Sequence, residues 1–161
     1  MRRRLLVLLL LLVLVASSAW GSEEDGVALR ELDGRAVTLG PPAEGRALVL
    51  HFWAAWCPMC DEDLANLERA LSACGPDGPQ VLAVNAGDKA DVVAGHVAKL
   101  GIELPVLLDP KGRAWRQIDG RGLPMNLFWS VDERRTAVGP MDEAAWRRAL
   151  APLGCLGGGG P

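Results

Sequence analysis

Residues 51–60 read HFWAAWCPMC, and this segment sets the architecture of the chain. The run from Ala47 to Trp53 is apolar apart from His51, which predicts a strand covered on both faces. From Cys57 onward, apolar residues recur at spacings of three and four, which predicts a helix with one buried stripe; these are Leu64, Leu67, Leu71 and Cys74. Cys57 and Cys60 therefore lie where a buried strand gives way to a helix.

This position favours redox chemistry of the C-x-x-C pair. The unpaired amides and the dipole of a helix N-terminus stabilise negative charge, so the Cys57 thiol should ionise below the free value of about 8.5. We expect Cys57 to be the nucleophile and Cys60, one turn further and more buried, to resolve the mixed disulfide. Pro58 suits a first helical turn, which needs no amide hydrogen there. We expect Trp53 and Trp56 to form an apolar rim around the sulfur atoms.

The segments on either side of the dithiol predict an α/β fold. A lead-in hairpin around Asp33 and Gly34 is expected first. Strand and helix then alternate, which indicates a mixed central sheet with helices on both faces. The expected elements are strands at 80–85 and 105–108, a helix capped by Asp88 and ending at Leu100, a short helix near Trp115, a hairpin of 125–131 and 134–138, and a final helix capped by Asp142.

The N-terminus predicts export. Three arginines precede twelve apolar residues and then small residues, the arrangement of a signal peptide. The apolar run falls short of the roughly 20 residues that a spanning helix needs, although an uncleaved short anchor is the alternative. We expect residues 1–21 to be this signal, 22–154 the folded domain and 155–161 a flexible tail.

Composition limits the function classes. A chain of 161 residues, half of them apolar, suits one domain with a proper core. The formal charge is −3, and it becomes −6 without the arginines of the signal. No cationic run occurs after the first four residues, which argues against a nucleic-acid partner. A charged fraction of 23% with an ordinary apolar content also excludes a disordered chain.

Other uses of the cysteines stay open at this point. The C-x-x-C pair could be an inert staple or half of a zinc site, although zinc would want a second close pair of ligands. Cys57 and Cys60, with Met59 nearby, could instead bind Cu(I) as soft ligands. Cys74 and Cys155 could form a second disulfide in an oxidising compartment, or Cys74 could be a buried small hydrophobe.

The segment FWAAWCPMC resembles the active-site segment of the thioredoxin superfamily. With VLAVNAGDKADVVAGHVAKLGIELPVLLDPKG and GLPMNLFWSVD, the likeness extends to its exported TlpA/ResA-type branch and covers residues 27–153. It implies a thioredoxin-like fold with a cis bond between Leu123 and Pro124. That loop, with Trp56, Pro58 and Met59, would contact an extended client peptide by strand addition.

The resemblance also implies a role for one acidic side chain. Asp63 matches the position at which the branch carries a glutamate thought to tune the cysteines and relay protons, although Asp is shorter and Glu62 is a rival. The alternative is a solvated helix-surface carboxylate. His51 stands where the branch usually has asparagine, and it could exchange protons near neutral pH or be a satisfied core histidine. We expect His96 to lie on the flank or surface of its helix.

Together these features predict a periplasmic thiol-disulfide oxidoreductase, a protein disulfide reductase. The resemblance implies that it reduces exported client proteins, with apocytochrome c as the leading candidate, and that a membrane electron donor re-reduces it. No cofactor is needed because the sulfur pair carries two electrons. We expect a monomer. A dithiol oxidant or isomerase, a copper-handling module and a non-catalytic peptide-binding module are the alternatives.

Overall fold

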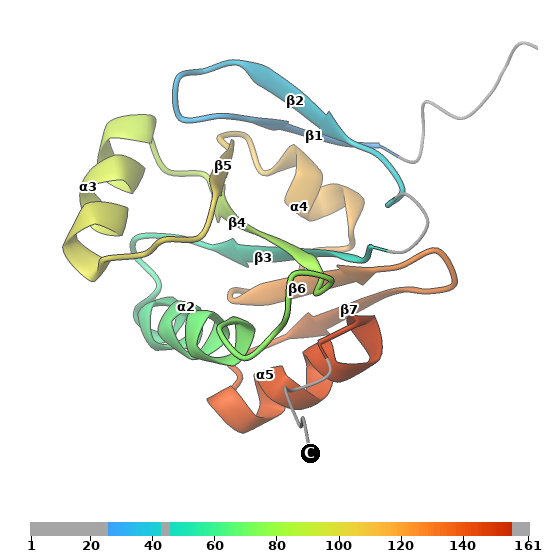
Figure 1. Cartoon of the computed structure of the whole chain (residues 1–161). Helices are drawn as coiled ribbons and strands as arrows, with labels where there is room; N and C mark the ends of the chain where they lie inside the picture. Colours follow the sequence, from blue (N-terminus) through green and yellow to red (C-terminus); the bar gives the residue numbers. More distant parts are fainter. Residues whose placement is uncertain (1–25, 43–45, 156–161) are drawn as a thin grey trace, which may run out of the picture.

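The sheet is mixed and contains the expected lead-in hairpin. The computed structural model describes residues 26–42 and 46–155, and within them seven strands form one sheet in the order β2-β1-β5-β4-β3-β6-β7 (Figure 1). Strands β3, β4 and β5 are parallel, and the other neighbouring pairs are antiparallel. The strands are β1 (Val27–Arg30), β2 (Ala36–Leu39), β3 (Leu48–Trp53), β4 (Gln80–Ala86), β5 (Val106–Asp109), β6 (Met125–Trp129) and β7 (Arg134–Val138).

Helices cover both faces of this sheet. Helices α2, α3 and α5 contribute to the core cluster on one face, and α4 packs on the other. Figure 1 shows α2 and α5 on the side of β3 opposite to α4. The helices are α2 (Pro58–Leu71), α3 (Ala90–Leu100), α4 (Arg113–Gln117), α5 (Glu143–Leu150) and the 3₁₀ turn η1 (Ala151–Leu153).

Strand β3 is buried along its whole length and apolar apart from His51 because it contributes to two cores. Its side chains alternate between the faces: Val49 and Trp53 join the cluster with α2, whereas Leu50 and Phe52 join the cluster with α4. His51 shares the parity of Val49 and Trp53, so it faces α2. The expectation that Trp53 forms part of an apolar rim is therefore wrong, because its side chain is only 1% exposed. Trp56 is 68% exposed, as a rim residue would be.

Two local expectations also change. The N-cap of α3 is Lys89, without a side-chain cap hydrogen bond, so Asp88 does not cap that helix. Helix α2 ends at Leu71 and does not reach Cys74. The cap of α5 is confirmed, because Asp142 accepts a hydrogen bond from the Ala145 amide at 2.6 Å.

The C-terminal end of the domain is tied down by a second disulfide. Cys155 is buried and bonded to Cys74, 81 residues earlier. The domain therefore reaches one residue past the expected boundary at 154. The predicted signal and the rest of the predicted tail lie outside the described residues. No helix within 26–42 and 46–155 is long and apolar enough to cross a membrane.

Candidate active site

The C-x-x-C pair is a disulfide at the start of α2. Cys57 is the N-cap residue with an extended backbone, Pro58 occupies the first turn, and the Cys60 amide donates to the Cys57 carbonyl at 3.0 Å. The two Cα atoms are 5.4 Å apart. Cys57 is 4% exposed and Cys60 is fully buried. Cys57 is thus the less buried of the two cysteines, and its assignment as the nucleophile stays a prediction.

The loop before Cys57 is held by a side chain that the sequence analysis placed elsewhere. The Asp88 carboxylate accepts hydrogen bonds from the Ala55 amide at 2.7 Å and from Asn85 Nδ2 at 2.9 Å. Asn85 Oδ1 in turn accepts from the Asp88 amide at 3.0 Å. The sequence signal for this role was a buried asparagine near the end of β4, followed three residues later by an aspartate. Asp88 thus fixes the dithiol loop from the loop that follows the neighbouring strand β4.

The Leu123–Pro124 peptide bond is cis, as the resemblance implied. It precedes β6, whose Met125 pairs with Phe52 near the end of β3, so the proline loop and the dithiol loop lie at the same edge of the sheet. Leu123 packs against the core cluster that contains both cysteines, and with Trp56 it lines one surface cleft. Met59 is 53% exposed on the first turn of α2. Of the residues expected to contact a client, Trp56 and Leu123 therefore line one cleft, and the contact itself stays a prediction.

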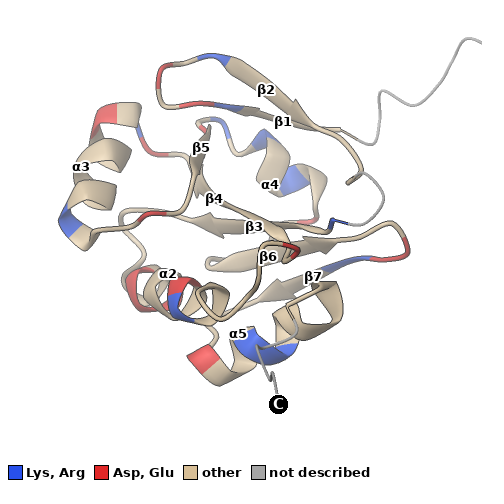
Figure 2. Cartoon of the chain, in the orientation of Figure 1, with Lys and Arg blue, Asp and Glu red and all other residues tan. Residues whose placement is uncertain are grey.

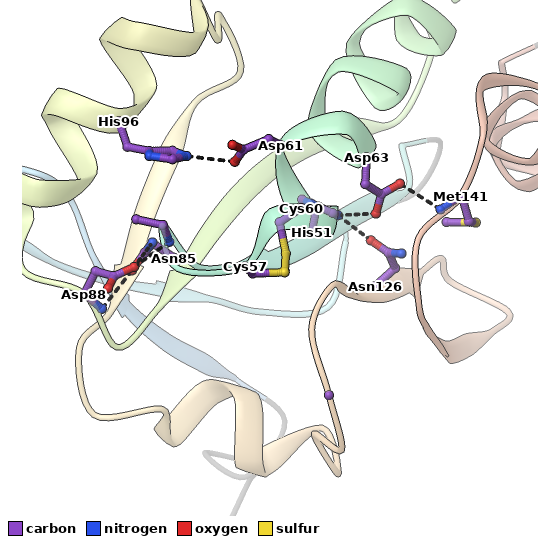
Figure 3. The surroundings of a disulfide bond; sticks show 12 residues. His51, Cys57, Cys60, Asp61, Asp63, Asn85, Asp88, His96, Asn126 and Met141 are labelled. Atoms are coloured by element: carbon purple, nitrogen blue, oxygen red, sulfur yellow. Dashed lines mark hydrogen bonds and ion pairs between the residues drawn. A yellow bond between two sulfur atoms is a disulfide. The ribbon is translucent and has the colours of Figure 1, made fainter.

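Asp63 is a buried carboxylate, 1% exposed, and not a helix-surface residue. Its Oδ1 accepts hydrogen bonds from the Met141 amide at 2.9 Å and from Trp146 Nε1 at 2.7 Å. Its Oδ2 lies 3.9 Å from His51 Nδ1 and has no hydrogen-bond partner among the described residues. The rival Glu62 is exposed. Figure 3 shows His51 and Asp63 beside the disulfide.

His51 is fully buried and faces the same interior. Its Nδ1 lies 2.8 Å from Asn126 Oδ1, and its Nε2 has no partner among the described residues. Burial lowers the pKa of His51, opposed by the charge of Asp63, and burial raises the pKa of Asp63, opposed by His51. The site therefore favours a neutral imidazole beside a carboxyl group that binds a proton more readily than an exposed one.

The remaining candidates play structural parts. His96 Nε2 lies 2.8 Å from Asp61 Oδ1, so it links α3 to α2 from the flank of its helix, with 16% of its side chain exposed. Within the described part of the chain, no group of three or more His, Cys, Asp or Glu side chains is placed to hold a metal ion. What the arrangement can perform is thiol-disulfide exchange coupled to a buried proton acceptor.

Comparisons with known proteins agree with this geometry. The AhpC/TSA family matches residues 24–138. The thiol-disulfide oxidoreductase ResA of Halalkalibacterium halodurans is 27% identical over 89 residues, 55% of this chain and 50% of that protein. The soluble secreted antigen MPT53 of Mycobacterium tuberculosis is 30% identical over 101 residues, 62% of this chain and 56% of that protein. The chain thus spans about half the length of these two curated relatives.

A solved structure extends the likeness to the whole fold. The crystal structure of a putative thiol:disulfide interchange protein DsbE from Chlorobium tepidum has 28% sequence identity and a TM-score of 0.68. The match covers 83% of this chain and 97% of that one. The expected thioredoxin-like fold is confirmed, and with it the similarity to the exported ResA-type branch.

Proposed function

This chain belongs to the AhpC/TSA family, and we propose that it is an extracytoplasmic thiol-disulfide oxidoreductase that reduces disulfides of exported client proteins. The observation that carries this proposal is the Cys57–Cys60 disulfide at the start of α2, with Cys57 the less buried cysteine and the Leu123–Pro124 loop at the same edge of the sheet. A dithiol in this place can attack a disulfide presented along that loop.

The reaction runs in two exchanges. The Cys57 thiolate, stabilised by the amides of the first turn of α2, attacks one sulfur of the client disulfide. A bond between Cys57 and the client forms, the client disulfide breaks, and the released client sulfur takes a proton from water. Cys60 then gives up its proton and attacks the Cys57 sulfur, which releases the second client thiol. Two electrons have moved to the client, and the enzyme is left as the disulfide.

The second exchange needs an acceptor for the Cys60 proton. Cys60 is fully buried, so water does not reach it, whereas Asp63 lies one turn further along α2 and faces the same interior. Because burial raises the pKa of Asp63, its carboxylate takes up a proton more readily than an exposed one. Asp63 Oδ2, which has no hydrogen-bond partner among the described residues, offers a free position for that proton.

The surroundings of the dithiol support the reducing direction. Strong dithiol oxidants owe their potential to a stabilised reduced form, and a nearby imidazolium would give such stabilisation to a thiolate. Here burial lowers the pKa of His51, so the imidazole stays neutral, and Asp63 is a carboxyl group. The interior of the site therefore supplies no imidazolium to stabilise a thiolate, which supports the reducing direction.

Two features support a place outside the cytoplasm. The disulfide between Cys74 and Cys155 suits an oxidising compartment, and the relative MPT53 is named a soluble secreted antigen. With the predicted signal at residues 1–21, these favour the periplasm, either free or held by an uncleaved N-terminal segment. Apocytochrome c is the leading candidate client, and a membrane dithiol donor would restore the reduced enzyme, which we take to be a monomer.

Trapping in the native host tests this function. Cys60→Ser leaves the nucleophile but removes the resolving thiol, so mixed disulfides with clients should accumulate on Cys57. Cys57→Ser, the matched control, should trap none. If Cys60→Ser also captures nothing while the client pool is oxidised, the order of attack is wrong. Equilibration of the wild-type protein with glutathione tests direction: we expect a potential nearer about −270 mV than about −120 mV, and the latter value would identify an oxidant.

A further inference from the structure

A cleft of about 490 Å³ opens next to the dithiol and the proline loop. Trp56 and Leu123, which directly precede Cys57 and Pro124, lie in its wall together with Trp115. The Trp115 ring is held in place, because its Nε1 donates to the Gly122 carbonyl at 3.3 Å and the ring covers Gly120 so closely that a Cβ there would lie 2.2 Å from it. Two indoles therefore frame a site large enough for a bulky side chain.

The rim of this cleft carries positive charge, although the protein as a whole is acidic. Lys111, Arg116 and Arg121 line it, and no Asp or Glu does. All three cations are exposed, and none forms an ion pair with a described residue. The Arg116 guanidinium donates to the Lys111 carbonyl at 2.8 Å, which holds it at the rim. Figure 2 shows Lys and Arg gathered on α4 and the loop before it, whereas the chain as a whole carries a net charge of −3.

We propose that this cleft selects clients by the sequence around their cysteine: a large apolar side chain beside the cysteine, followed by acidic residues. The inference rests on the proposed function, since it names the substrate class for the same dithiol. The apolar side chain would lie between Trp56 and Trp115, and the carboxylates would face Arg116 and Arg121. Opposite charges at a rim mainly speed association and set specificity, and salt screens them.

Two matched peptides test the preference. Each carries phenylalanine before a single cysteine that is blocked as a mixed disulfide with 2-mercaptoethanol; one continues with aspartate and glutamate, the other with asparagine and glutamine. We expect reduced wild-type enzyme to react with the acidic peptide about tenfold faster at low ionic strength. The ratio should fall toward one at high salt and in the double variant Arg116→Gln/Arg121→Gln. A double variant Lys99→Gln/Arg148→Gln, which removes two exposed cations from α3 and α5, should keep it.

Equal rates with the two peptides, or a ratio that survives Arg116→Gln/Arg121→Gln, would overturn the inference. A binding measurement distinguishes the absence of this preference from an absence of exchange activity. The oxidised protein is titrated with the same peptides carrying serine in place of cysteine, and binding is read from the indole fluorescence. Tighter, salt-sensitive binding of the acidic peptide supports the cleft even if no exchange occurs, and equal affinities reject it. Hydroxyethyl disulfide, which is small and uncharged, reports the dithiol alone, and its lack of reduction would reject the proposed function.

Discussion

Replacing both residues of the second disulfide, Cys74→Ala with Cys155→Ala, should destabilise the domain severely and leave the redox site in place. The bond joins residues 81 apart, and a closed loop of this size removes about 15 cal/mol/K from the entropy of the unfolded chain. At 25 °C that corresponds to about 4.5 kcal/mol, an upper value because the unfolded state retains some structure. We expect a loss of at least about 2 kcal/mol and a fall in Tm of roughly 5–15 °C.

Urea unfolding of the oxidised proteins, followed by circular dichroism, measures the loss. The comparison variant is Cys57→Ala/Cys60→Ala, which removes a disulfide between residues three apart. The same relation gives this bond a much smaller entropic effect, about 1.6 kcal/mol. The Cys74→Ala/Cys155→Ala protein should still reduce hydroxyethyl disulfide. A stability loss below about 1 kcal/mol would refute the reasoning, and loss of exchange in the folded variant would show that this disulfide takes part in the redox cycle.

Two further predictions concern buried and half-buried carboxylates. Burial raises the pKa of Asp63 above 3.8, so the stability that its neutral form contributes is complete below about pH 4 and is lost as the pH rises through the pKa of the folded state. The Tm of Asp63→Asn should therefore rise relative to that of wild type as the pH increases from 4 to 8, whereas the Tm difference between Glu62→Gln and wild type should not change with pH. Asp63→Asn should also flatten the pH profile of exchange. A constant Tm difference across that range would contradict it. Asp88→Ala removes the acceptor of the Ala55 and Asn85 hydrogen bonds. It should lower the free energy of unfolding by about 1–3 kcal/mol and slow exchange with hydroxyethyl disulfide. The control is Asp91→Ala, which changes an exposed residue of α3; equal unfolding midpoints of the two variants would speak against a positioning role of Asp88.

The dithiol and its place in the fold were predictable because their signals are local. A continuous apolar run followed by apolar residues at spacings of three and four defines β3 and α2, and both lie within the window over which side-chain periodicity acts. The same applies to the cap of α5 by Asp142. The family likeness added the cis bond before Pro124, for which spacing alone carries no signal.

The polar interior of the site was not predictable in the same way. A strand buried on both faces shows no alternation, so the sequence of β3 does not reveal that His51 and Trp53 face α2. For the same reason it could not separate Trp53, which is in the core, from Trp56, which is at the surface. The role of Asp88 was missed because its partner amide belongs to Ala55, 33 residues earlier.

The amino-acid sequence by itself determined the chemistry: two thiols one turn apart at the start of a helix, in a chain with the composition of a single acidic domain. Only the tertiary structure decided what surrounds them, because contacts between β3, α2 and α5 depend on how whole faces pack and not on neighbouring residues. It placed Asp63 against His51 and Trp146 in the buried interior, joined Cys74 to Cys155, and brought the cations of the α4 region to the cleft beside the dithiol.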